Sequence, residues 1–99
     1  MASSEDALPT YGLYIDGGEV PSASGAHFPT DDPYTNQPWA RIARGNADDV
    51  NRAVAAAQRA FESGPWPRMT ATQRGQLLRK LGDLLALHAP RLGEIERRD

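Results

Sequence analysis

The sequence contains no cysteine among its 99 residues. This absence excludes disulfide bonds, thiolate metal sites and thiol nucleophiles. A reaction that needs a catalytic thiolate therefore cannot be carried by these residues alone.

Long apolar runs and an excess of positive charge are missing as well. The longest mainly apolar stretch, Leu84 to Leu87, is far shorter than the ~20 residues that span a bilayer. The first six residues show no basic region followed by an apolar core, so we expect a cytoplasmic protein without a secretory signal. With 11 basic and 13 acidic side chains, the net charge of −2 gives no reason to expect a nucleic-acid partner.

What is present divides the chain into three segments. Residues 1–10 are small and polar, and we expect them to be flexible. Residues 11–45 are rich in Gly and Pro and are predicted to form short strands and turns. Residues 46–99 are rich in Ala, Leu, Arg and Gln in a helical pattern. The expected fold class is α+β, with an N-terminal β-hairpin and short strands followed by two to three α-helices.

The first extended runs predict a β-hairpin. Leu13–Ile15 and Glu19–Val20 flank Asp16-Gly17, and both of these turn residues tolerate the positive φ that a two-residue hairpin turn needs. Two further strands are predicted at His27–Phe28 and at Trp39–Ala43. Strands this short need another element to cover one face.

Between the last two strands, the stretch from Asp32 to Asn36 predicts a turn. Pro33 stands at its second position, and Asn36 stands where a left-handed residue is needed. The link before it, Ser22 to Gly25, is predicted to be a loop.

Capping residues mark the first helix. Asn46 is a favourable N-cap, and Asp48 and Asp49 follow in the first turn, where the helix dipole favours negative charge. We expect an ion pair between Asp48 and Arg52, four positions apart. Gly64-Pro65 is predicted to end this helix.

Two more helix starts follow. Thr70 and Gln73 have the spacing of a capping box at the start of a second helix. Pro90 suits the first turn of a third helix. This third helix has no C-cap glycine, so we expect a truncated chain. Large apolar residues recur at helical spacing on the first two helices, and we expect both stripes to face a surface outside this chain. They are Val50, Ala53, Val54, Ala57 and Phe61 on the first helix, and Leu77, Leu78, Leu81, Leu84 and Leu85 on the second.

Residues that could carry chemistry have a simpler structural explanation in each case. His27 and His88 lack the ligand spacing of a zinc site. Asp31 and Asp32 precede a proline and favour turn chemistry, and Asp48-Asp49 favours helix-dipole chemistry.

The remaining candidates are no stronger. No serine lies in a G-x-S-x-G elbow, and Gly12, Gly17 and Gly18 do not form a phosphate-binding loop. Trp66, between two prolines, is interpreted as an anchor for the turn between helices, with a binding surface as the alternative. The serines considered are Ser3, Ser4, Ser22, Ser24 and Ser63. We therefore assign no catalytic, cofactor-binding or metal-binding residue.

Several short motifs follow one another in a fixed order along the chain. They are Tyr14-Ile15-Asp16-Gly17, Ser24-Gly25, Phe28-Pro29, Asp32-Pro33-Tyr34-Thr35, Asp49-Val50, Ala53 to Ala57, Ala60-Phe61, Gly64-Pro65-Trp66, Arg74, Leu77-Leu78 and Leu81. Their order and spacing resemble the amino-terminal region of NAD(P)-dependent aldehyde dehydrogenases. The sequence departs from the usual family pattern at Asp16, where Asn is common, and at Glu19, where an aromatic residue is frequent.

This resemblance implies that the chain is an N-terminal fragment of a larger α/β enzyme with a Rossmann-like cofactor domain, a catalytic domain and an oligomerisation arm. Such an enzyme oxidises an aldehyde to a carboxylic acid with NAD or NADP, through a cysteine thiolate and a glutamate expected beyond position 99. Residues 46–99 would be a truncated part of the cofactor-binding domain. The implied partners are the remainder of the same polypeptide and further copies of the enzyme, and the segment alone is expected to be inactive and to bind no cofactor.

Two alternatives stay open. The chain could be a small stand-alone helical module whose apolar stripes bind a partner protein, which predicts cooperative folding in isolation. It could also be a small enzyme of unknown type, which requires a convergent polar site.

Overall fold

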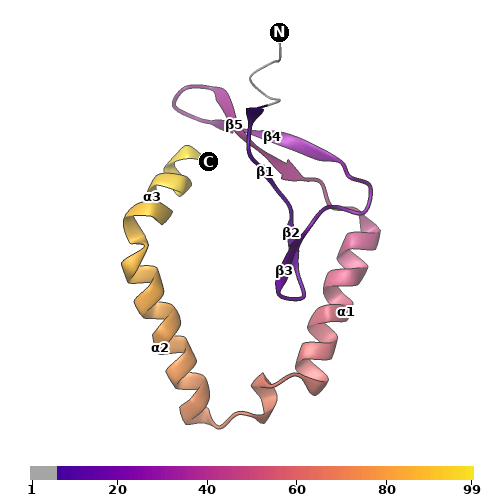
Figure 1. Cartoon of the computed structure of the whole chain (residues 1–99), viewed down its shortest axis with the longest axis vertical. Coiled ribbons are helices and arrows are strands. Elements are labelled where there is room, and N and C mark those ends of the chain that lie inside the picture. Colours follow the sequence, from indigo (N-terminus) through magenta and orange to yellow (C-terminus); the bar gives the residue numbers. More distant parts are fainter. Residues whose placement is uncertain (1–6) are drawn as a thin grey trace.

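Two small β-sheets and three α-helices form an open frame (Figure 1), seen in a computed structural model that describes residues 7–99. The elements in chain order are β1 (Thr10–Tyr11), β2 (Leu13–Ile15), β3 (Gly18–Val20), β4 (His27–Asp32), β5 (Gln37–Ala43), α1 (Ala47–Ser63), the short 3-10 helix η2 (Trp66–Arg68), α2 (Ala71–Leu87) and α3 (Ala89–Arg98). The mixed composition confirms the predicted α+β class of the segment.

The strands form two separate pairings. In the first sheet β5 lies in the middle, parallel to β1 and antiparallel to β4. The second sheet is the predicted β2–β3 hairpin. Its turn residues Asp16 and Gly17 have φ values of 55° and 80°, which confirms the predicted turn. Asn36 has φ of 57° between β4 and β5, where a left-handed residue was predicted.

Two predicted boundaries are wrong. Thr10, expected within a flexible segment, lies in β1, because the carbonyl of Pro9 accepts a hydrogen bond of 2.9 Å from the N–H of Arg41 on β5. The strand predicted at His27–Phe28 continues to Asp32, because the pairing with β5 extends that far. Residues 1–6 of the predicted flexible segment lie outside the described residues.

All three helix starts agree with the sequence. Asn46 and Asp49 form a reciprocal capping box at α1, and Thr70 and Gln73 form one at α2. Pro90 lies in the first turn of α3, where its missing N–H costs no hydrogen bond. These local signals explain why the helices begin where they do.

The predicted ion pair on α1 is wrong in its partner. Arg52 binds Asp49, three positions earlier, rather than Asp48. Asp49 is buried at the start of the helix, whereas Asp48 faces solvent. The helix ends as predicted, where the N–H of Gly64 donates to the carbonyl of Ala60.

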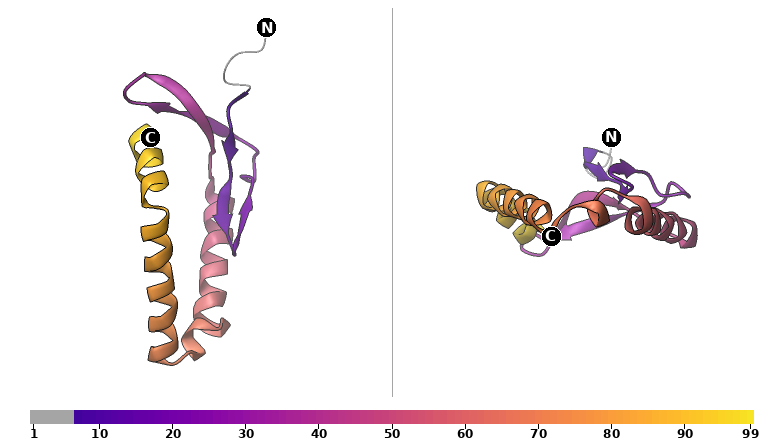
Figure 2. Two further views of the ribbon diagram at one scale, coloured as in Figure 1. Left: turned by 60° about the vertical axis from the view of Figure 1, so that its left-hand side comes forward. Right: turned by 90° about the horizontal axis from the view of Figure 1, so that it is seen from below.

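The frame buries little of its apolar surface. Ala40, Ala43 and Ala56 are its buried apolar residues, and no large side chain within residues 7–99 is fully buried. The chain extends over 56 × 35 × 18 Å with a radius of gyration of 17.5 Å. A compact chain of this length would have a radius of about 13 Å. Figures 1 and 2 show the cause, because α1 and α2 run as two separate arms joined at η2.

Small side chains let α1 approach the β2–β3 hairpin. The contact surface lies between the hairpin turn and one face of the helix, and a salt bridge of 3.5 Å between Asp16 and Arg59 closes it. The helix contributes Ala53, Ala56, Ala57 and Ala60 to this surface. The larger residues of α1 therefore point elsewhere.

Within the described residues, no helix is both long and apolar enough to cross a membrane. The cytoplasmic location stays a prediction.

Candidate functional site

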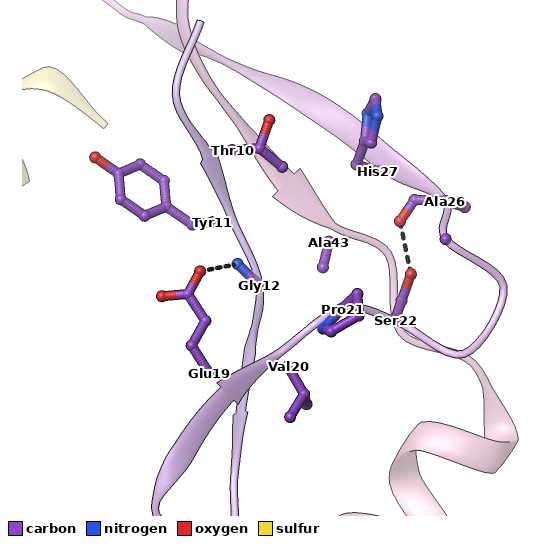
Figure 3. A pocket seen from close by; sticks show the side chains of 11 residues that line it. Thr10, Tyr11, Gly12, Glu19, Val20, Pro21, Ser22, Ala26, His27 and Ala43 are labelled. Atoms are coloured by element: carbon purple, nitrogen blue, oxygen red, sulfur yellow. Dashed lines mark hydrogen bonds between the residues drawn. The ribbon is translucent and has the colours of Figure 1, made fainter.

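A hollow of about 330 Å³ lies where the two sheets meet, and Figure 3 shows its lining. Two of its polar side chains come from β3 and from the loop that follows. The Glu19 carboxylate accepts a hydrogen bond of 2.9 Å from the backbone N–H of Gly12. The Ser22 hydroxyl donates to the carbonyl of Ala26, also at 2.9 Å. Both side chains therefore hold backbone segments together.

This arrangement explains the unusual Glu19. Its side chain reaches from β3 to Gly12, the residue between β1 and β2, and so links the hairpin to the end of the first strand. Gly12 is required at the same place, because an added Cβ would lie 2.5 Å from the carbonyl oxygen of Val20. The departure from the family pattern is thus accommodated by a backbone hydrogen bond.

The hollow has no arrangement for nucleophilic catalysis. The proton of the buried Ser22 hydroxyl is engaged by a carbonyl oxygen, so no base is positioned to remove it. His27 also lines the hollow, but its side chain on β4 is exposed to solvent. The hollow is consistent with a structural role.

The other singled-out residues are dispersed. His88 lies at the junction of α2 and α3, on a different element from His27. The described residues contain no group of three or more His, Asp or Glu side chains that could hold a metal ion. Asp32 confirms its predicted turn role, because its Oδ1 accepts a hydrogen bond of 2.8 Å from the N–H of Tyr34. Asp31 is exposed.

The serines also bond to nearby backbone. Ser24 accepts from the N–H of Ala26, and Ser63 donates to the carbonyl of Arg59. Ser3 and Ser4 lie outside the described residues. Trp66 lies in η2 with 45% of its surface exposed, and its role as a turn anchor stays a prediction.

Asp49 has a larger role than the sequence indicated. It is 3% exposed, and its Oδ2 accepts from the N–H of Asn46 at 2.9 Å. Its Oδ1 accepts from the N–H of Ala23 at 2.9 Å and from the Arg52 guanidinium. The backbone hydrogen bond from Asn46, followed by those from Arg52 and Ala23, lowers the pKa of Asp49 below its ordinary value.

Part of this role has a sequence signal. Asn and Asp three positions apart at a helix start resemble a capping box, which could have suggested the contact with Asn46. The contact with Ala23 is 26 positions away in sequence and has no local signal. The prediction of helix-dipole chemistry alone therefore described Asp49 incompletely.

The N-termini of α1 and α2 are poorly suited to bind a cofactor phosphate. Helix N-termini bind phosphate through free N–H groups. At α1 and α2, part of that capacity is used by the side chains of Asn46 and Thr70, and the first turn of α1 also carries two carboxylates, Asp48 and Asp49. These residues do not fit a cofactor pyrophosphate.

The most extensive feature is apolar. Two surfaces, which we name the α1 face and the α2 face, expose large side chains over much of each helix, as the sequence predicted. The prediction is wrong for Ala53 and Ala57, which line the contact with the β2–β3 hairpin instead. Exposed fractions run from 43% at Leu77 to 78% at Phe61. The α1 face consists of Val50, Val54 and Phe61, and the α2 face of Leu77, Leu78, Leu81, Leu84 and Leu85. Exposed apolar patches of this kind are typical of surfaces that bind another protein, a membrane or a ligand.

Comparison with known proteins gives a consistent result. The model of the "Aldehyde dehydrogenase family" matches residues 20–99. Over 84 residues the chain is 48% identical to "Aldehyde dehydrogenase family 2 member B4, mitochondrial" of Arabidopsis thaliana, which covers 85% of this chain and 16% of that protein. The chain spans 16–18% of the length of the curated relatives it matches.

Solved structures agree. The NAD+ complex of an aldehyde dehydrogenase from Bacillus cereus superposes with a TM-score of 0.88 at 34% identity, over 100% of this chain and 21% of that one. An NAD-dependent aldehyde dehydrogenase from Sinorhizobium meliloti superposes with a TM-score of 0.85 at 37% identity, over 90% of this chain and 18% of that one.

Proposed function

Because the chain belongs to the aldehyde dehydrogenase family, we propose that it is a scaffold segment of an enzyme that oxidises an aldehyde to a carboxylic acid with NAD or NADP. On its own the segment is inactive. The observation that carries this proposal is the exposure of the α1 face and the α2 face on a frame that buries no large side chain within residues 7–99.

Burial of the α1 face and the α2 face would stabilise a fold that buries few apolar side chains within residues 7–99. Full burial of one Leu or Phe side chain gains roughly 1.5–3 kcal/mol. Leu78, Leu81 and Leu85 each leave about half of their surface in water. In the two solved relatives this segment corresponds to 18–21% of the chain, so most of each enzyme remains to provide a covering surface.

The chemistry would come from that remainder. Residues 7–99 contain no cysteine, and the Ser22 hydroxyl in the hollow is engaged by the carbonyl of Ala26. The thiolate, the glutamate and the cofactor-binding groups that the resemblance implies would therefore lie elsewhere in the enzyme. The family resemblance also supports a homo-oligomeric enzyme, which size-exclusion chromatography of the whole protein would test.

A chimeric enzyme tests the proposal. Residues 7–99 replace the corresponding segment of the Bacillus cereus aldehyde dehydrogenase, and the reduction of NAD+ by an aldehyde is followed by absorbance. We expect activity from the chimera, none from the isolated chain and none from the host enzyme without the segment. Activity of the isolated chain would contradict the scaffold role, as would a folded chimera that binds NAD+ but does not turn over.

One observation favours the alternative of a stand-alone interaction module. The end of α3 contacts β4, so the two ends of the frame meet without other protein. Cooperative unfolding of a monomeric isolated chain, combined with an inactive chimera, would make this alternative the better account.

A further inference from the structure

The last turn of α3 returns to the β4–β5 hairpin, about seventy positions away in sequence (Figure 2). The Thr30 hydroxyl donates a hydrogen bond of 2.5 Å to Oδ1 of Asp99. A salt bridge of 3.7 Å joins Arg97 to Asp32. Alongside them, the Arg98 guanidinium lies 5.2 Å from the centre of the Trp39 ring. We name these six residues the clasp.

Apolar groups lie beneath the clasp. Leu92 and Ile95 of α3 share one hollow with Trp39 and Ile42 of β5 and with Tyr11 of β1. Ile95 is 36% exposed and Leu92 44%, less than most of the α2 face, so the sheet partly covers them. Polar and apolar contacts therefore lie together at this junction, a combination typical of a docking interface.

The helix that bears the clasp is joined to α2 by an irregular link. His88, between the two helices, has φ of −100° and ψ of 10°, outside the helical values. Pro90 follows in the first turn of α3 and has no N–H to continue the hydrogen bonds of α2. The irregular backbone at His88 and the missing N–H of Pro90 separate α3 from α2 as a helix with its own direction.

We propose that α3 is a strap that closes the frame onto the β4–β5 hairpin through the clasp, and so holds the α2 arm in place before other protein covers the α1 and α2 faces. Closing would fix the relative position of the two arms in advance. A pre-positioned surface loses less conformational freedom when it is covered. The part of the inference that concerns covering of the two faces rests on the proposed function, whereas closure itself is tested on the chain alone.

The closed state is held by weak contacts. Arg97 is 51% exposed and also binds Glu94 in its own helix, so its pairing with Asp32 is partly screened by water. Closure must also offset the loop entropy of the intervening chain. The strap is therefore expected to open readily when a charge of the clasp is removed.

Cysteine pairs test the closure, because residues 1–99 include no cysteine that could compete. In one variant Thr30→Cys is combined with Asp99→Cys, which replaces the hydrogen-bonded pair. In the control Thr30→Cys is combined with Ser63→Cys, at the far end of α1 in Figure 1. Both are oxidised in a dilute glutathione buffer, and the intrachain disulfide is quantified by mass spectrometry.

The control separates closure from chance contact. In an unfolded chain the 30–63 pair closes a loop about half as long, and so would form its disulfide about threefold more readily. If the strap closes, the 30–99 disulfide should form more readily than the 30–63 disulfide. The ratio of the 30–99 to the 30–63 disulfide should exceed the ratio expected for an unfolded chain by about tenfold or more. Equal formation of both disulfides, or a preference for 30–63, would overturn the proposal.

A charge variant then tests the clasp itself. In the 30–99 cysteine variant, Arg97→Gln should lower disulfide formation severalfold, because the salt bridge with Asp32 is lost. Arg79→Gln, which removes the same charge from an exposed position on α2, should leave it unchanged. If both substitutions have the same effect, the polar clasp does not hold the strap. Activity of the chimeric enzyme enters neither test.

Discussion

The Oδ1 atom of Asp49 accepts a hydrogen bond of 2.9 Å from the backbone N–H of Ala23, and so joins the start of α1 to the loop between β3 and β4. The same carboxylate accepts from Asn46 within the capping box. One buried side chain thus fixes the position of the loop relative to the start of the helix. At the other end of the hairpin, Asp16 and Arg59 hold the turn along the helix.

Replacing Asp49 is therefore expected to loosen the loop as well as the helix. Asp49→Ala leaves the N–H groups of Ala23 and Asn46 without their acceptor, and unsatisfied donors destabilise the folded state. Hydrogen exchange should show faster exchange of the Ala23 amide. Urea unfolding should show a lower midpoint. Asp48→Ala is the matched control, since its exposed carboxylate should affect only the helix dipole. Equal effects of the two variants would show that the Ala23 contact contributes nothing.

Acid should remove the contribution of Asp49 to stability. Hydrogen bonds from Asn46, Arg52 and Ala23 hold the pKa of folded Asp49 below its ordinary value of 3.8. Around and below that pH the unfolded state binds more protons, so stability falls as pH falls. The contribution is complete above about pH 5 and is lost through 3.8 towards the lower folded-state pKa.

The measurement compares the natural chain with Asp49→Asn, which does not titrate. The difference between their urea midpoints should be largest near neutral pH and should shrink at about pH 3. A difference that stays constant with pH would mean that the charge of Asp49 does not stabilise the fold.

The sequence predicted features that depend on neighbouring residues and missed those that depend on distant ones. The Asp16-Gly17 turn and the Thr70 cap were found because their residue types act within a few positions. The pairing of Thr10 with β5 was missed, because it is fixed by a segment about thirty positions away. The choice of Asp49 over Asp48 by Arg52 depends on burial, which spacing alone does not give.

The α2 cap offers a local test of helix stability. Thr70→Ala removes the hydroxyl that accepts from the N–H of Gln73 and should cost about 1 kcal/mol of unfolding free energy. Thr72→Ala, inside the same helix, should be neutral or slightly stabilising because Ala has the higher helix propensity. Urea unfolding followed by circular dichroism at 222 nm measures both. A cost at Thr72 that matches the cost at Thr70 would argue against the capping box.

Two glycines should respond in opposite directions to the same substitution. Gly12→Ala places a Cβ 2.5 Å from the carbonyl oxygen of Val20 and should destabilise the junction of β1 with the hairpin. Gly75→Ala meets open space on α2 and should stabilise the helix by about 0.5–1 kcal/mol. Thermal unfolding measures the stability of the two variants. A neutral Gly12→Ala would mean that the hairpin and β1 are not packed as closely as described.

The central claim, that other protein of an aldehyde dehydrogenase covers the α1 and α2 faces, is tested most directly by one substitution in two settings. Leu81→Lys places a charge in the middle of the α2 face, where 52% of the leucine is exposed in the chain alone. Thermal unfolding and NAD+ reduction are measured for the chimeric enzyme, and the helix signal and aggregation for the isolated chain. We predict that the isolated chain keeps its helix content and aggregates less, whereas the chimera loses thermal stability and activity because a charge is buried without a partner. A chimera that tolerates Leu81→Lys as well as the isolated chain does would contradict the account.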